Sequence, residues 1–335
     1  MSAIKICLKE KEAVGFVGDI HFDTVISSRL DDYLETCCKK IEAVGDICLK
    51  NNVRYLFFAG DIFNRVQCGH ECVNRAGQSL LKLKNNGIRL FSICGNHDLP
   101  RDSLRLLGKA PLETLFSFGV MEHISLETPV EFYKDEFFDQ NKGCAKITAV
   151  DFTQKIPKAD RNFDANVLLA HMFFDKSGFL SDEFQNILKD KMAFWFYDMA
   201  FLGHDHEESP VAVCGNTLVV RTGSLLRTTS HNYNFVRKPH IVICDDIFKP
   251  KEIRKVFVRC AEFRTIVSQA VINQKELGDV IKDDKEMLQE LAGKLSDMKV
   301  NDEDTEDAIL NIIETDTSIS DSRRGLLLSY IQKVS

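Results

Sequence analysis

Apolar and polar positions alternate along the first part of the chain in a strand–helix–strand order. Short apolar runs over residues 13–18, 54–59 and 88–93 have the length expected of buried strands. Between them, residues 30–49 and 71–84 carry apolar side chains at helical spacing. This order predicts βαβ units and a largely parallel sheet.

The middle of the chain predicts short strands with polar connections. The apolar runs expected to form strands are 121–125, 130–133, 144–150, 166–170 and 198–202, followed by a hairpin over 211–220 and two strands within 237–258. Gly215 and Asn216 separate the two arms of that hairpin, which is a common turn sequence. We expect these strands to form a second sheet layer opposite the first.

The last part of the chain is acidic and helical. Residues 272–322 contain 15 Asp and Glu against 5 Lys and Arg. Residues 277–298 and 324–334 carry apolar positions at helical spacing, and the second segment is too short to bury its own apolar face. We therefore expect three regions: a main α/β domain over 1–245, reduced cap or connector strands over 246–270, and an acidic helical module over 271–335.

Composition narrows the class of protein. Of the 335 residues, 44% are apolar, which is enough for a sizeable core, and the net charge of -7 argues against nucleic-acid binding over the whole surface. The eleven cysteines include no C-x-x-C pair, so we expect them to be reduced and buried. We see neither a signal peptide nor an apolar run long enough for a membrane helix, and we expect a soluble, cytoplasmic protein.

Five short polar motifs stand where the predicted strands end. They are Gly18-Asp19-Ile20-His21, Gly60-Asp61, Gly95-Asn96-His97-Asp98, His171, and Gly203-His204-Asp205-His206. Ligands in open α/β sheets bind beyond the carboxyl ends of the strands, so we expect these side chains to converge. Carboxylate, carboxamide and imidazole donors without a thiolate favour Mn²⁺, Fe²⁺ or Zn²⁺ over Ca²⁺. One shared carboxylate can bridge two such ions.

Together the five motifs resemble the calcineurin-like metallophosphoesterase superfamily over roughly residues 14–245. The resemblance implies an α/β (α+β) fold, a four-layer αββα sandwich with a small C-terminal helical module. It also implies a ligand set with Asp61 as the bridge between two metals. By this resemblance the first metal takes Asp19, His21 and His206, and the second takes Asn96, His171 and His204.

The same resemblance implies the chemistry. His97 would bind the phosphate and protonate the leaving oxygen, and Asp98 would orient His97. A metal-bridging hydroxide would attack phosphorus in line, which makes the protein a two-metal phosphodiesterase. The expected ions are two Mn²⁺, with Mg²⁺, Fe²⁺ or Zn²⁺ as alternatives.

Within the superfamily, the chain is most similar to the SbcD branch of double-strand-break repair nucleases, including phage versions. The residues that carry this similarity are Ala59-Gly60-Asp61-Ile62-Phe63, Gly95-Asn96-His97-Asp98, Gly223-Ser224 and the helical tail. The similarity implies the nuclease subunit of an SbcCD-like nuclease–ATPase complex, with exonuclease and endonuclease action at DNA ends or hairpins. An SbcC-type ATPase would dock on the C-terminal helices. A homodimer, and a role in DNA repair or recombination in a bacterial or phage-infected cell, are implied as well.

Two residues are candidate substrate contacts. Asn64 follows the Ile62-Phe63 pair, at a position where relatives often carry His or Asp. Arg227 lies shortly after Gly223-Ser224 and could reach a DNA phosphate.

Other interpretations of the sequence remain open. The protein could be a stand-alone metallophosphatase, a small-molecule or nucleotide phosphodiesterase, or a scaffold without turnover. The C-terminal helices could pack on their own domain instead of on a partner. Residues 68–72 read Cys-Gly-His-Glu-Cys but lack the second half of a zinc motif, so no zinc is expected there. The histidines outside the motifs are expected to be structural or on the surface: His70, His123, His231 and His240.

Overall fold

The structure is a computed structural model that describes residues 2–134, 143–175, 187–188, 196–208, 211–228, 234 and 237–261. The chain divides into two units, residues 1–272 and 273–335. The second unit lies outside the described residues, so the helices expected over 277–298 and 324–334 stay predictions. In the part that is described, no helix has the length and apolar character needed to cross a membrane.

The first sheet has six strands in the order β15-β14-β2-β3-β4-β5. Its parallel part consists of β2 (Ala13–Val17), β3 (Val53–Phe58), β4 (Arg89–Ser92) and β5 (Glu122–His123). It is extended by two antiparallel strands, β14 (His240–Cys244) and β15 (Ile253–Phe257). The two strands expected within 237–258 therefore extend the first sheet, and not the second layer in which they were expected. The backbone of β14 pairs with β2 from Val242 opposite Phe16 to Cys244 opposite Val14.

The second sheet has seven strands in the order β1-β6-β7-β8-β11-β13-β12 and is also mixed. Its strands are β1 (Ile4–Leu8), β6 (Val130–Lys134), β7 (Cys144–Val150), β8 (Ala165–His171), β11 (Met199–Gly203), β12 (Ala212–Cys214) and β13 (Thr217–Val220). The hairpin expected over 211–220 is β12 and β13. β1 is a short edge strand that pairs in parallel with β6, and it was not among the expected strands. Two further short strands, β9 (Phe174–Asp175) and β10 (Ile187–Leu188), pair with each other.

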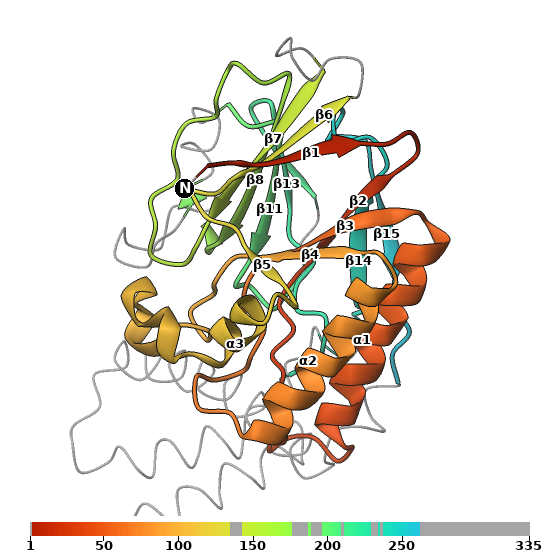
Figure 1. Cartoon of the computed structure of the whole chain (residues 1–335), viewed down its shortest axis with the longest axis vertical. Helices are drawn as coiled ribbons and strands as arrows, with labels where there is room; N and C mark the ends of the chain where they lie inside the picture. Colours follow the sequence, from red (N-terminus) through yellow and green to blue (C-terminus); the bar gives the residue numbers. More distant parts are fainter. Residues whose placement is uncertain are drawn as a thin grey trace, which may run out of the picture. The chain divides into compact units, whose positions relative to one another are not determined.

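The described helices cover the outer face of the six-stranded sheet (Figure 1). They are α1 (Tyr33–Lys50), α2 (His70–Asn85) and α3 (Pro111–Ser117), with the short 3₁₀ turns η1 (Pro100–Asp102) and η2 (Leu104–Lys109) before α3. Asp32 caps α1 by accepting the Glu35 N–H at 2.9 Å. The buried face of α1 repeats at helical spacing through Leu34, Ile41 and Val44.

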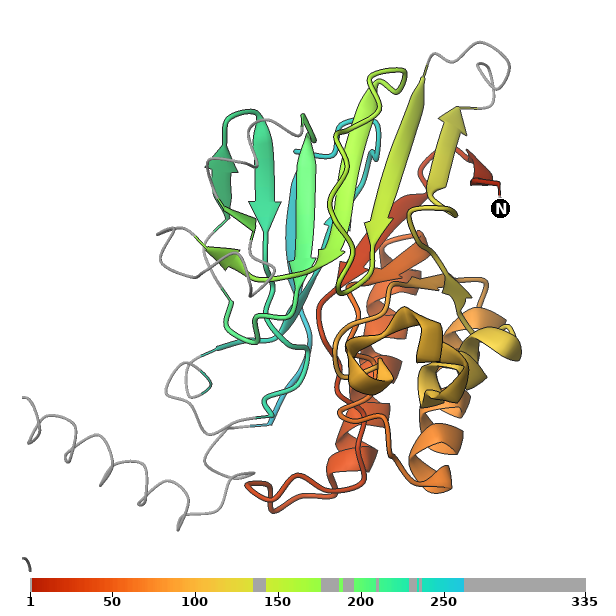
Figure 2. The ribbon, with the colours of Figure 1, turned by 90° about the vertical axis from the view of Figure 1, so that its left-hand side faces the viewer.

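The two sheets pack face to face around an aromatic core (Figure 2). In β2, Val14 and Phe16 point toward the other sheet, and Val17 points toward the helices, as the two-residue period of a strand requires. The Phe16 ring stacks on Phe57 and Phe201 at centroid distances of 5.6 and 5.3 Å. Among the described residues, the segment 151–164 packs on the outer face of the seven-stranded sheet. The expected fold class, two mixed sheets layered with helices, is confirmed.

Candidate metal centre

The five motifs lie at the carboxyl ends of strands from both sheets. Asp19 follows β2, Asp61 follows β3 and Asn96 follows β4; His171 ends β8 and His204 follows β11. Backbone hydrogen bonds join the first two loops. The N–H groups of residues 20 and 21 donate to the carbonyl oxygen of residue 61 at 3.0 and 2.9 Å. The sheet order therefore brings together side chains that are far apart in the sequence.

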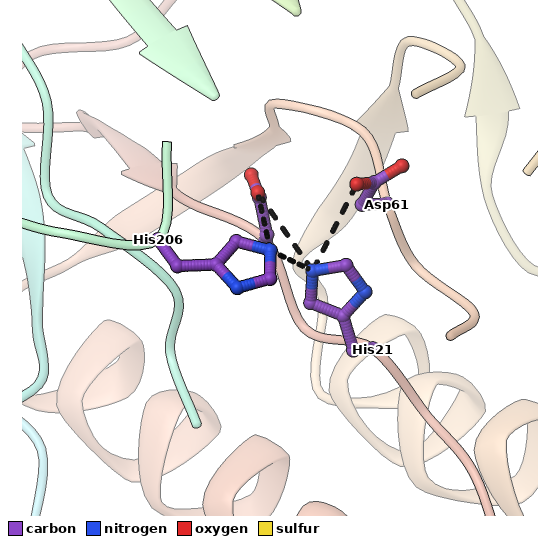
Figure 3. Close-up of side chains that lie close together, drawn as sticks. His21, Asp61 and His206 are labelled. Carbon is purple, nitrogen blue, oxygen red and sulfur yellow. Dashed lines mark hydrogen bonds and ion pairs between the residues drawn. The ribbon is translucent and has the colours of Figure 1, made fainter. Parts of the chain in front are cut away.

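One group of candidate ligands consists of Asp19, His21, Asp61 and His206, whose ligand atoms all lie within 4.8 Å of one another. The Nε2 atoms of His21 and His206 are 2.7 Å apart. The Nε2 of His21 is 3.9 Å from Asp19 Oδ2 and 3.8 Å from Asp61 Oδ2. Figure 3 shows the His21 and His206 rings and the Asp61 carboxylate turned toward one another.

A second group shares Asp61 and adds His171, His204 and Asn96. His171 Nε2 is 3.3 Å from Asp61 Oδ2 and 3.1 Å from Asn96 Oδ1. His204 Nδ1 is 2.9 Å from the same Asn96 oxygen and 3.2 Å from His171 Nε2. Adjacent ligands of an octahedral ion with bonds of about 2.1 Å are separated by about 3.0 Å, which these distances match.

The Asp61 carboxylate connects the two groups and has one unsatisfied oxygen. Its Oδ1 accepts the backbone N–H of His97 at 2.9 Å. Its Oδ2 is buried and makes no hydrogen bond, although His21 and His171 face it from either side. A buried acceptor without a partner is costly, and a cation would satisfy it. The donor set and this orphaned oxygen therefore fit two divalent ions with Asp61 between them.

Burial and charge set the protonation of the site. Burial alone would raise the pKa of Asp61, but the imidazoles around it, first His171, hold that pKa below its usual range. Burial raises the pKa of Asp19 to about 7, and it lowers the pKa of His204 to about 3 and of His206 to about 4. Both of these histidines are therefore neutral at neutral pH and have lone pairs available for a metal.

Hydrogen bonds to the backbone fix which nitrogen of a histidine faces the centre. His171 Nδ1 lies 2.6 Å from the carbonyl oxygen of Ala59. A carbonyl only accepts, so Nδ1 keeps its proton, and Nε2, which faces Asp61 and Asn96, is the nitrogen that a metal would bind after deprotonation. The ring is oriented by the end of β3 before any metal binds.

The backbone at three candidate ligands is left-handed. The φ angles of His21, Asp61 and His204 are 60°, 48° and 87°. Side chains other than glycine rarely adopt this region, and such strain concentrates at functional sites. Close approach also requires Gly95, where an added Cβ would lie 2.1 Å from Asp61 Oδ1. These three candidate ligand residues therefore have backbone angles that they locally disfavour, and the packing of the loops holds them there.

His97 lies at the edge of the first group, and its orientation differs from the expectation. Its ring centroid is 4.9 Å from that of His21, and its Nδ1 is 2.6 Å from the carbonyl oxygen of Asn64. Asp98 was expected to orient His97. Instead the buried Asp98 carboxylate accepts the backbone N–H groups of Ile62, Phe63 and Gly95 at 3.3, 3.1 and 3.0 Å. Asp98 therefore ties the loop after β3 to the loop after β4.

The side chains of the two candidate substrate contacts both make hydrogen bonds within the chain. The side-chain nitrogen of Asn64 donates to Asp23 Oδ2 at 2.8 Å, so Asn64 acts on the site through the carbonyl that holds His97. Arg227 is 5% exposed, and its guanidinium donates to the carbonyl oxygens of Asn234 and Ala261. Arg227 therefore supports the fold, because the guanidinium is enclosed by chain segments that precede and follow β14.

Asp23 also belongs to this site, although it was not among the predicted site residues. Its buried carboxylate accepts hydrogen bonds from Asn64 and from Arg65, whose Nε lies 2.8 Å away. Arg65 itself is 54% exposed beside the centre. The sequence did offer a signal for Asp23. It follows His21 by two residues, as His21 follows Asp19, so it continues the alternating polar positions of that motif.

The fold and the site define a metal-dependent phosphoesterase. The sequence model of the calcineurin-like phosphoesterase family matches residues 13–208, so the chain belongs to that family. The match contains all the candidate ligands and confirms the resemblance drawn from the five motifs.

Two relatives carry the comparison further. The chain is 24% identical over 263 residues to the DNA double-strand break repair protein Mre11 of Methanococcus maripaludis, covering 76% of this chain and 66% of that protein. It is 26% identical over 204 residues to the protein of the same name from Thermoplasma acidophilum, covering 56% of this chain and 52% of that protein. The chain thus spans less than two thirds of the length of either relative. A solved archaeal phosphodiesterase has a TM-score of 0.36 and 16% identity, over 73% of this chain and 99% of its own.

Proposed function

We propose that this protein is a two-metal DNA phosphodiesterase, the nuclease subunit of an SbcCD-like nuclease–ATPase complex. The observation that carries the proposal is the pair of ligand groups joined by the unsatisfied Asp61 Oδ2. The similarity to two proteins named as DNA double-strand break repair proteins supports DNA as the substrate. Mn²⁺ is the proposed ion, because the set of oxygen and imidazole donors suits it.

In this proposal Asp19, His21 and His206 hold one ion, and Asn96, His171 and His204 hold the other, with Asp61 between them. Two bound divalent ions lower the pKa of water and neutralise negative charge on the phosphoryl oxygens. The chain's own part is to fix the ligands: the Ala59 carbonyl sets the tautomer of His171. The burial of Asp61 also excludes water from competing for its free oxygen.

His97 is proposed to deliver a proton to the leaving oxygen. Its Nδ1–H donates to the Asn64 carbonyl, so the proton that it exchanges with substrate is on Nε2. The backbone N–H of His97 also binds Asp61 Oδ1, which fixes the base of the side chain against the centre. A general acid must lie within hydrogen-bond reach of the atom it protonates, and this anchoring gives His97 a fixed approach.

The function is tested by turnover of the purified full-length protein with Mn²⁺. Three substrates are compared: bis-p-nitrophenyl phosphate, p-nitrophenyl phosphate and end-labelled DNA. We expect cleavage of the diester and of DNA, and we expect His97→Ala to reduce both by about 100-fold or more. The variant should keep its bound metal, because neither ligand group includes the His97 imidazole.

Two other outcomes would change the assignment. Rapid hydrolysis of the monoester with untouched DNA would make the protein a stand-alone phosphatase. Loss of metal from the His97→Ala variant would make His97 a ligand instead of an acid.

The proposed protein partner is inferred from the acidic helical module, residues 271–335. Residues 277–298 and 324–334 present apolar positions at helical spacing, which suits helix-in-groove recognition by an SbcC-type ATPase. The acidic charge of this region suits a basic surface on that partner. Dimerisation of the nuclease and a role in DNA repair or recombination complete the proposal.

A further inference from the structure

A third group of ligand-type side chains lies apart from the two that share Asp61. It consists of Cys94, His123 and Asp151, whose Sγ, ring nitrogen and carboxylate oxygen lie within 4.8 Å of one another. These residues stand at the carboxyl ends of β4, β5 and β7, so they come from both sheets. Cys94 and Asp151 are fully buried, and His123 is 28% exposed.

A single nitrogen faces both of the other ligands. His123 Nε2 is 3.6 Å from Cys94 Sγ, and it is 3.1 and 3.3 Å from the two oxygens of Asp151. In the metal-free protein the Asp151 carboxylate accepts hydrogen bonds from both the His123 N–H and the Cys94 S–H. The three side chains thus direct their donor atoms at one small volume, which suits a metal ion that replaces these protons.

The two separations measured from His123 Nε2 match those around a tetrahedral zinc ion. With Zn–S of about 2.3 Å and Zn–N or Zn–O of about 2.0–2.1 Å, tetrahedral angles place sulfur and nitrogen about 3.6 Å apart and nitrogen and oxygen about 3.4 Å apart. The distances from His123 Nε2 to the sulfur and to the farther oxygen are 3.6 and 3.3 Å. Thiolate, imidazole and carboxylate are the three side-chain donors that zinc takes.

We propose that Cys94, His123 and Asp151 bind a zinc ion at a site distinct from the proposed dinuclear centre. The exposed edge of His123 gives the ion access and lets a water molecule complete four ligands. This site does not depend on the proposed nuclease function, because none of its side chains belongs to the two groups around Asp61.

The position of the site suits an ion that stabilises the packing of strand ends from the two sheets. The Cys94 N–H donates to Asp151 Oδ1 at 2.6 Å, and the Phe152 N–H donates to the Cys94 carbonyl at 2.9 Å. Cys94 is two residues before Asn96, and the Phe152 ring is 5.6 Å from that of His204. Zinc would therefore clamp the end of β7 to the ends of β4 and β5 beside two candidate ligands of the second group.

The test uses cobalt as a probe for the thiolate ligand. Full-length protein is stripped of metal and loaded with Co²⁺, and the near-ultraviolet thiolate-to-cobalt charge-transfer band is recorded. The dinuclear centre has only oxygen and nitrogen donors and produces no such band. Zinc bound per chain is measured in parallel by elemental analysis of protein loaded with Zn²⁺.

Three variants decide the assignment. Cys94→Ser and His123→Gln should each lose the cobalt band and one bound zinc per chain. Cys68→Ser should keep both; it is the matched control, because Cys68 belongs to the Cys-x-His-x-Cys segment at residues 68–72 and not to the proposed site. His123→Gln changes a partly exposed side chain, so it decides the question even if Cys94→Ser fails to fold.

The proposal is overturned if the native protein shows no thiolate band. It is also overturned if the band survives in folded His123→Gln, or if Cys68→Ser alone removes it. In those cases His123 and Asp151 form an ordinary hydrogen bond between the strand ends.

Discussion

At the scale of single residues, the candidate centre depends on which atom each side chain leaves free. Asp61 uses one carboxylate oxygen for the His97 N–H and leaves the other without a hydrogen bond. His171 uses Nδ1 for a backbone carbonyl and turns Nε2 inward. These local hydrogen bonds select the metal-binding atoms before an ion arrives, which reduces the reorganisation that binding requires.

The first residue-scale prediction concerns pH. Burial lowers the pKa of His171, but the Asp61 carboxylate outweighs it and raises that pKa to about 9; burial raises the pKa of Asp19 to about 7. In the metal-free protein, protons on these groups compete with the ion at neutral pH. We therefore expect Mn²⁺ binding to release protons and to strengthen as pH rises through 7 toward 9.

Calorimetric titration with Mn²⁺ in two buffers of different ionisation enthalpy measures this release. The observed heats should differ between the buffers, and the affinity should increase with pH. Equal heats together with an affinity independent of pH would show that both groups are already deprotonated.

The second residue-scale prediction concerns Asp98. Asparagine at this position replaces an acceptor oxygen by a donor that faces backbone N–H groups. We expect Asp98→Asn to lower the free energy of unfolding by about 1–3 kcal/mol, the range for a buried hydrogen-bonding group left without a partner. Urea denaturation checks it, with Glu42→Gln as the control, because Glu42 pairs with Lys82 on the surface and should contribute under 1 kcal/mol. Lost turnover at unchanged stability would instead mean that Asp98 acts on His97.

At the scale of elements, parallel strand ends and tightly packed loops make the site. The loops after β2 and β3 are joined by backbone hydrogen bonds, including Phe22 N–H to the Ile62 carbonyl at 2.8 Å. The loop after β4 is tied to the second of them by the Asp98 carboxylate. Hydrogen bonds between loops therefore hold together the ligands from three strands of one sheet, and the His204 N–H joins them to β11 by donating to the Asp19 carboxylate at 3.1 Å.

The element-scale prediction uses a glycine in this packing. Gly95→Ala would place a Cβ 2.1 Å from Asp61 Oδ1, so the carboxylate and its loop must shift. We expect Mn²⁺ affinity to fall by about 10-fold or more, as for other changes that misplace a ligand. Gly108→Ala is the matched control, because an added Cβ there has no atom within 4 Å. Equilibrium dialysis measures both, and equal affinities would show that the loop yields without moving Asp61.

At the scale of the whole molecule, the two sheets share one hydrophobic core, and the acidic residues 272–322 come after this domain in the sequence. The core between the sheets includes the stack of Phe16 on Phe57 and Phe201, which fixes one sheet against the other. Residues near the end of the described chain are also anchored to this domain, because Lys40 Nζ donates to the carbonyl oxygen of Arg259 at 2.5 Å. Residues up to 261 therefore belong to the catalytic unit.

The whole-molecule prediction is a truncation. Removing residues 265–335 keeps the backbone acceptors of Lys40 and Arg227, so hydrolysis of bis-p-nitrophenyl phosphate should keep most of its rate. Binding of an SbcC-type ATPase should be abolished, because the proposed docking helices are gone. Co-purification with the ATPase measures the second effect. A truncated chain that still binds the ATPase would place the docking surface on the catalytic domain.

The sequence by itself determined the fold class and the list of candidate ligands. Both follow from local pattern: apolar runs with a two-residue or helical period define the elements, and motifs that directly follow a strand must lie at its carboxyl end. The short edge strand β1 was not predicted because Lys5 interrupts its apolar run and only one of its residues is buried; its pairing with β6 is a tertiary contact.

Only the tertiary structure decided what each polar side chain contacts. Asp98 binds backbone 35 and 36 residues away, and Asn64 binds Asp23 over 41 residues. Arg227 is enclosed by segments on both sides of β14, and Cys94 meets Asp151 across 57 residues. Such pairs depend on strand order and on sheet-to-sheet packing. Those arise from the summed burial of the whole core, which no short stretch of the sequence encodes.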